Sequence, residues 1–466
     1  MTALHAGAAS ADITPPPGAM LDGYGGRFTP STGVHDPLMA RALVLDYGAP
    51  SAHPEALEGA APQRTDAVNA AAIVVLDLLG IHPWMAAELR RRARETLGIP
   101  EDALILSATH DHAAPIGLRS GMFSRLDEDL AEKTVAACLD ALRCAWNDRR
   151  PATMKIGSID VEGIGMNRRD PDGPVESTLR ILLFDGEEGP VASLMSYACH
   201  ATVLSGANLE ITAEFPGAAC RIVEAATGAP TVYVQGACGD TNPVWVRQDF
   251  ASVERAGQRL AGAALGLIAD LRGVGDGLRV HNIRWDEFID SPVEGRIVEP
   301  RLRFARHGIE LPLREFASDE EYAARVEAAK AEAEQHPEAS AGRRAAMAKR
   351  SRFEGERWAA VWSRRSGESG ARRTEVQAVS LGDGVALLAL PGEFFAETGA
   401  MIRRLSGIEE LIVAGYANDY VGYVPPAHAY PEGGYECGVT FFKEEAEAII
   451  RKVSLDTLQE VCRNGD

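Results

Sequence analysis

The sequence predicts an α/β protein built on mixed β-sheets flanked by helices. Over roughly the first third of the chain, short apolar runs alternate with longer amphipathic stretches, as strands and helices do when they follow one another. Residues 152–198 instead hold three strand-like runs separated by turn signals, which is typical of a meander. The 466 residues are 46% hydrophobic, so the chain can bury a large core without disulfides or structural metals.

The N-terminal part begins with residues 7–30, whose many Gly and Pro residues predict an irregular segment rather than a helix or a central strand. The runs that follow predict strands at 41–47, 73–79 and 104–106 and helices at 84–97 and 130–146. Because strand and helix alternate here, we expect a largely parallel sheet covered by helices.

The rest of the chain holds further strands on both sides of a charged stretch. The predicted strands are 154–161, 178–185, 191–197, 231–234, 376–390 (divided by a hairpin turn at 382–384) and 411–415. The predicted helices are 218–226, 252–271 and 442–453. Residues 295–373 are dense in Arg, Glu and Ala, and we expect two helices there that form a peripheral insertion within a single domain spanning residues 1–466.

Two histidines closely follow the predicted strand at 104–106. In extended chain, residues i and i+2 point to the same face, so His110 and His112 can aim at one point beyond the strand end. Imidazole is a good zinc ligand when it is neutral. The His-x-His pair alone does not separate a metal site from two polar loop histidines.

Three further apolar strands end in polar groups. His200 and Glu393 each follow one of them, and residues 418–423 follow the third. Four such ends predict a shared mouth over the sheet edges, where open α/β sheets bind ligands. Glu393 is a candidate metal ligand or base, with a place in the first turn of a helix as the alternative.

Another strand end, after residues 231–234, carries Gly239, Asp240, Thr241 and Asn242. Glycine there permits a ligand to approach the backbone closely, and backbone N–H groups could form an oxyanion hole; an ordinary tight turn is the alternative. Together with Tyr420, these four residues are candidates for contacts with a substrate or an oxyanion.

Composition narrows the partners. The formal net charge of −20 argues against nucleic acid and anionic membrane surfaces. No apolar run is long enough to cross a bilayer, and the N-terminus lacks the basic and apolar regions of a signal peptide. Seven cysteines without a Cys-x-x-Cys pair indicate reduced thiols. We therefore expect a cytoplasmic protein without a stable membrane anchor that acts on a small molecule, and homo-oligomerisation stays open.

Several motifs that span nearly the whole chain together resemble one family. They are Asp12-Ile13-Thr14-Pro15-Pro16, His35-Asp36-Pro37-Leu38, Thr109-His110-Asp111-His112, Asn167-Arg168, Cys199-His200, Gly239-Asp240-Thr241-Asn242-Pro243, Pro391-Gly392-Glu393-Phe394 and the loop 418–423. On these motifs the sequence resembles the N-terminal catalytic domain of the neutral, non-lysosomal ceramidases and their bacterial relatives, without the immunoglobulin-like C-terminal domain.

The resemblance implies a zinc-dependent enzyme that cleaves an amide. Carried over to this sequence, it implies His110, His200, Glu393 and Tyr423 as the zinc ligands. It also implies that the catalytic residues His112 and Arg168 lie beside the carbonyl and polar head of the substrate. Nitrogen and oxygen ligands suit zinc, although tyrosine is an uncommon one.

The sequence departs from the family pattern at two points near the site. The motif Thr109-His110-Asp111-His112 continues with Ala113-Ala114 where the ceramidases have Ser-Gly, and Asn242 stands where they carry a serine linked to catalysis. We therefore expect a zinc-dependent hydrolase that cleaves an amide or related C–N or C–O bond of a small polar substrate, not ceramide itself. The alternatives are a metal-dependent lyase, isomerase or glycoside-cleaving enzyme on the same scaffold, or a non-catalytic binding protein.

Overall fold

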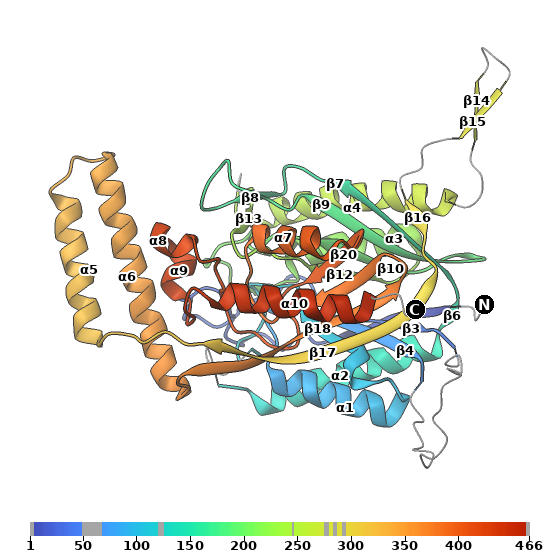
Figure 1. Cartoon of the computed structure of the whole chain (residues 1–466), viewed down its shortest axis with the longest axis horizontal. Coiled ribbons are helices and arrows are strands. Elements are labelled where there is room, and N and C mark those ends of the chain that lie inside the picture. The colour runs from blue at the N-terminus through green and yellow to red at the C-terminus, as the bar shows by residue number, and fades with distance from the viewer. Residues whose placement is uncertain are drawn as a thin grey trace.

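Three β-sheets share one apolar interior, and helices cover their outer faces (Figure 1). The computed structural model describes residues 4–48, 68–119, 125–244, 247–274, 279–282, 287–290 and 295–462. No helix among these residues is both long and apolar enough to cross a membrane. The mixed α/β class predicted from the sequence is confirmed.

The first two sheets have five strands each. The first sheet runs, in spatial order, β5 (Leu104–Ala108), β4 (Ala70–Leu76), β3 (Met39–Asp46), β1 (His5–Asp12) and β6 (Arg150–Pro151). The second sheet runs β12 (Thr231–Gln235), β10 (Gly189–Tyr197), β9 (Thr178–Gly186), β7 (Thr153–Asp160) and β16 (Arg296–Ile297).

The third sheet has four strands, and two-stranded pieces complete the β-structure. The third sheet runs β17 (Pro300–Pro312), β18 (Ala371–Gly382), β19 (Val385–Ala389) and β20 (Glu410–Ala414). The small pairs are β2 (Gly33–Val34) with β11 (Glu210–Ile211), β8 (Gly165–Asn167) with β13 (Thr241–Pro243), and β14 (Arg279–Asn282) with β15 (Glu287–Asp290).

Each sheet has its own helices. α1 (Pro83–Leu97) and α2 (Glu128–Asn147) lie on the first sheet, and α3 (Glu214–Thr227) and α4 (Phe250–Gly273) lie on the second. α10 (Ala446–Cys462) covers the third sheet with α7 (Ala396–Ser406) beside it. The two long helices α5 (Asp319–Glu334) and α6 (Ala341–Ser366) pack on each other as a hairpin that projects from the body (Figure 1), and α8 (Ala429–Glu432) and α9 (Tyr435–Val439) are short.

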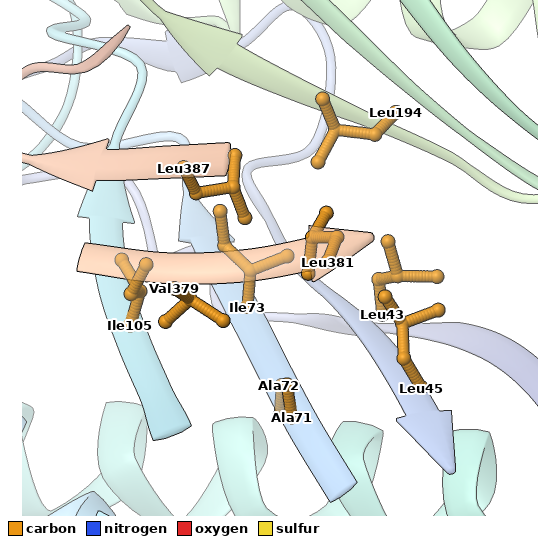
Figure 2. A pocket seen from close by; sticks show the side chains of 10 residues that line it. All are labelled: Leu43, Leu45, Ala71, Ala72, Ile73, Ile105, Leu194, Val379, Leu381 and Leu387. Atoms are coloured by element: carbon orange, nitrogen blue, oxygen red, sulfur yellow. The ribbon is translucent and has the colours of Figure 1, made fainter. Parts of the chain in front are cut away.

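Apolar side chains from all three sheets meet in the interior. Figure 2 shows a small cavity there, lined by aliphatic side chains from β3, β4, β5, β10, β18 and β19. Ile73, Ile105 and Leu387 are each at most 3% exposed. Burial of this kind stabilises a fold by about 25 cal/mol per Å² of apolar surface, so these sheets hold one another in place.

One parallel pair occurs in each sheet: β4–β5, β10–β12 and β19–β20. All other pairings within the three sheets are antiparallel. The expectation of a largely parallel sheet in the N-terminal part is therefore wrong, because β1, β3 and β4 pair antiparallel.

Two stretches that were predicted otherwise are strands. Residues 7–12, the start of the segment expected to be irregular, belong to β1, which lies between β3 and β6. Gly7 allows close packing rather than a turn, because a Cβ there would lie 2.1 Å from the carbonyl oxygen of Ala145 on α2. The range 295–373 holds α5 and α6 but also β16, β17 and the start of β18, so the helical part is narrower than expected. Because β17 carries several Arg and Glu side chains, its strand pattern could not be recognised in the sequence.

Candidate metal centre

Three histidines converge where the parallel strand pairs end. His110 and His112 follow β5, and His200 follows β10. One ring nitrogen from each lies within 4.8 Å of the other two, and this group could hold a metal ion. The Nε2 atoms of His110 and His112 are 3.2 Å apart.

Hydrogen bonds fix the tautomers of two of these imidazoles. The Nδ1 of His110 lies 2.8 Å from the carbonyl oxygen of Leu79, and the Nδ1 of His200 lies 2.7 Å from that of Cys238. Because a carbonyl only accepts, each Nδ1 must donate, which leaves the Nε2 lone pair for a ligand bond. His112 differs, since its buried Nδ1 has no hydrogen-bond partner in the described part of the chain.

Glu393 brings a carboxylate into the same centre. Its Oε2 lies 3.3 Å from the Nε2 of His110 and 3.2 Å from the Nε2 of His200. Its Oε1 accepts a hydrogen bond of 2.5 Å from the phenol of Tyr420. An isolated β-bridge joins Glu393 to Tyr423, so the strand ends after β19 and β20 are fastened together at the centre.

Tyr423 and Arg168 close one side of the centre. The Tyr423 hydroxyl lies 3.5 Å from the Nε2 of His200 and accepts a 3.0 Å hydrogen bond from the Nη2 of Arg168. Nη1 of the same guanidinium donates to the Asn242 side chain at 3.2 Å. The pairing of β8 with β13 explains this proximity, because it sets residues 165–167 against residues 241–243.

The four candidate residues Gly239 to Asn242 form mainly hydrogen bonds within the protein. The N–H groups of Gly239 and Thr241 donate to the carbonyls of Phe394 and Cys238, at 2.7 and 2.9 Å. The Asp240 carboxylate accepts from the N–H of Ala396 and from the side chain of Asn167. These two N–H groups are thus already paired. Among the predicted substrate and oxyanion candidates, the side chain of Asn242 bonds to the Arg168 guanidinium and that of Tyr420 bonds to the Glu393 carboxylate.

Burial controls the charges of the centre. It lowers the pKa of His112 well below its usual value and that of His200 to about 4, in the latter case with the Arg168 charge adding to the effect. Burial would raise the pKa of Glu393, but the neighbouring His110 and His200 rings outweigh it and hold that pKa well below its usual value. The neutral imidazoles of His112 and His200 and the ionised carboxylate of Glu393 form a set that attracts a cation.

The backbone near the centre includes unusual conformations. His110, Tyr416 and Asn418 have φ values of 61°, 54° and 64°, in the left-handed region that side chains other than glycine rarely occupy. The expectation that His110 and His112 share a face of extended chain is therefore wrong, and a turn brings the rings together instead. The N–H of Asn418 donates to the carbonyl of Leu106, and the side-chain oxygen of Asn418 accepts from the N–H of Leu106. These two hydrogen bonds attach the loop of Asn418 to β5.

Four residues around the centre were not predicted from the sequence. Tyr435 is 53% exposed, and its ring centroid lies 5.7 Å from that of Tyr423; the adjacent Glu436 binds Arg168. From the N-terminal segment, the ring of Tyr24 contacts that of His112 and Arg27 donates to the His112 carbonyl. Tyr435 and Glu436 lie in a stretch rich in Gly and Tyr that follows the motif at 418–423, and this composition was the one local signal that pointed to them.

Comparison with solved structures relates the whole architecture to known proteins. Neutral ceramidase from Pseudomonas aeruginosa matches with a TM-score of 0.70 at 18% sequence identity, covering 98% of this chain and 74% of that one. A ceramidase complexed with C2 matches with a TM-score of 0.69 at 17% identity, over 98% and 75% of the two chains. The sequence itself matches no protein-family model and no curated protein. The resemblance found in the motifs is thus confirmed in the fold, and the chain has the neutral-ceramidase fold.

Proposed function

We propose that this chain is a zinc-dependent hydrolase that cleaves an amide or related C–N or C–O bond. The observation that carries the proposal is the convergence of His110, His200 and Glu393 with both Nε2 lone pairs turned toward the carboxylate. Burying a carboxylate among imidazoles is costly unless the carboxylate is paired or binds a metal. The fold is also one that ceramidases have.

The residues present fit a zinc ion. His110, His200 and Glu393 would hold it, with the hydroxyl of Tyr423 beside them as the fourth ligand. We assign His112 to the reactant rather than to the ion, because no carbonyl fixes its tautomer as Leu79 and Cys238 fix those of the other two rings. A ring without a fixed tautomer can take up a proton at one nitrogen and release one at the other.

When bound, zinc would polarise the scissile group and lower the pKa of a bound water toward ~7. The protein groups then have separate tasks. Tyr420 holds Glu393 through Oε1 and leaves Oε2 toward the imidazoles. His112 exchanges a proton with the reactant, and Arg168 acts through the hydroxyl of Tyr423 and the amide of Asn242.

The substrate we propose is a small, polar amide and not ceramide. The support is Asn242, which replaces the family serine and whose side-chain oxygen is engaged by Arg168. A side chain held in this way recognises polar groups by its amide nitrogen rather than acting as a hydroxyl nucleophile or donor. A cytoplasmic setting follows from the composition alone and belongs to the same proposal.

Metal analysis tests the proposal most directly. We expect about one zinc ion per wild-type chain by plasma mass spectrometry, lost in His200→Ala and kept in His307→Ala, which changes an exposed histidine. A panel of short N-acyl amides in ¹⁸O-labelled water should yield labelled carboxylate. A wild-type chain that stays metal-free after incubation with zinc would contradict the proposal, and unlabelled product would indicate elimination instead.

A further inference from the structure

Glu436 is a buried carboxylate that holds two consecutive arginines. It lies on α9 and is 2% exposed. Its Oε1 accepts from the Nε of Arg168 and its Oε2 from an Nη1 of Arg169, each at 2.7 Å. A carboxylate buried to this degree is costly unless it is paired, so both arginines are needed to keep it there.

The bond from Glu436 determines the direction of the whole Arg168 guanidinium. The group is planar and its nitrogens form a rigid fork, so fixing Nε also fixes the two terminal nitrogens. These nitrogens donate to the side chains of Tyr423 and Asn242 on the wall of the candidate metal centre. The carboxylate of Glu436 bonds to Arg168 and Arg169 and not to the three histidines, so its influence on the centre passes through Arg168.

The helix that carries Glu436 rests on α6 of the projecting hairpin. α6 and α9 touch where two glycines meet: a Cβ added at Gly355 would lie 3.1 Å from the carbonyl carbon of Gly438. Beside this contact, the buried Glu356 accepts from Arg314, which also donates to the carbonyl of Cys437 at 3.0 Å.

The same support continues to the centre. Thr440, directly after α9, donates through its hydroxyl to the carbonyl of Tyr423 at 2.8 Å. The hairpin thus reaches Tyr423 by two routes, one through Glu436 and Arg168 and one through Thr440. Both depend on where α9 lies.

We propose that Glu436 is a positioning residue that orients Arg168 toward Tyr423 and Asn242, and that α6 keeps α9 in place for this task. The inference rests on the proposed hydrolase function for its effect on turnover. The orientation of the guanidinium can be tested independently of that function.

The first experiment compares Glu436→Gln with Glu432→Gln, which removes the exposed partner of Arg169 on the same segment. The Nε–H resonance of Arg168, identified by its loss in Arg168→Lys, should move toward that of a free arginine in Glu436→Gln only. Turnover of the fastest amide of the panel should fall about 10-fold, as for other outer partners of metal ligands, with zinc content and KM little changed.

Non-additivity separates positioning from general stability. If Glu436 acts through Arg168, the double variant Arg168→Gln/Glu436→Gln turns over as slowly as Arg168→Gln alone. An independent further loss in the double variant would overturn the inference. So would an unshifted Arg168 resonance in Glu436→Gln.

A second pair of variants tests the support by α6. Gly355→Leu should displace α9 and shift the Arg168 resonance, whereas Gly262→Leu places the same side chain on α4, where a Cβ meets nothing within 4 Å. If both leave the resonance in place, the role of α6 is refuted. If the resonance responds as expected but the wild type binds no zinc and cleaves no amide, the proposed function fails and the positioning by Glu436 stands.

Discussion

The interior between the sheets and the centre at their ends are equally buried but chemically opposite. Ile73, Ile105 and Leu387 are at most 3% exposed, and His110, His200 and Glu393 are at most 2% exposed. In the interior every buried atom shown in Figure 2 is carbon, and burial itself stabilises the fold. In the centre burial is unfavourable for the polar imidazoles and for the carboxylate, and hydrogen bonds to Leu79, Cys238 and Tyr420 offset it.

The same strands contribute to both regions. β5 places Ile105 in the interior and is followed by His110, and β19 places Leu387 there and is followed by Glu393. Each of these strands therefore has apolar residues in the interior and a polar residue beyond its end. A change confined to one region should leave the other intact, and the following variants test that separation.

The largest effect should come from the interior. Ile73→Ala leaves a cavity among the three sheets, and we expect it to lower the free energy of unfolding by about 2–5 kcal/mol. Chemical denaturation measures the loss, and zinc content at low temperature should stay that of the wild type. Ile73→Val, as the graded control, should cost about 0.5–1.5 kcal/mol. Loss of zinc from folded Ile73→Ala would show that the two regions are not separable.

A smaller effect is expected from Tyr420→Phe, and it should fall on the metal centre rather than on the apolar interior. The variant removes the hydroxyl that holds Oε1 of Glu393, so zinc affinity should fall about 10- to 100-fold in a chelator competition. Tyr47→Phe is the matched control, because it also removes one buried phenol hydrogen bond, to the carbonyl of Leu381 in the interior. Equal zinc affinities in the two variants would argue against Glu393 as a ligand.

The smallest effect, taken per pH unit, concerns the pH dependence of stability. Burial raises the pKa of Glu214 from its usual 4.5 to about 7. Between these values the folded chain keeps a proton that the unfolded chain releases, so stability is greatest below the window and declines as pH rises through it, by at most about 1.4 kcal/mol per pH unit. Glu214→Gln should lack this decline in denaturation curves, with Glu188→Gln as the exposed control. An unchanged pH profile in Glu214→Gln would refute the assignment.

The parts of the site that could be predicted from the sequence are those where a run of apolar residues ends in a polar residue. The apolar runs before His110, His200 and Glu393 are real strands, and the structure brings all three residues together. The reasoning from extended chain at His110 failed because the residue lies in a left-handed turn, which no spacing rule reveals.

Other elements carried misleading signals. β1 consists mostly of small residues, and at Gly7 α2 packs closely on it, whereas β17 carries charges on its exposed positions. Glu436 could not be chosen from the sequence, since nothing local marks the one glutamate of many that meets Arg168. Its significance depends on packing between α6 and α9, which only the tertiary structure contains.

The parallel pairs have a consequence for how the protein matures. The groups around the centre come from residues 110 to 423, and each pair that presents them needs a long crossover before its second strand can dock. Contacts this distant in sequence form slowly. A nascent chain that ends before Tyr423 would lack part of the proposed ligand set. Zinc would then bind the finished fold in preference to any partly folded chain and so deepen its stability by mass action. Under the proposed function, tight zinc binding would require that the chain has been synthesised and folded at least as far as Tyr423.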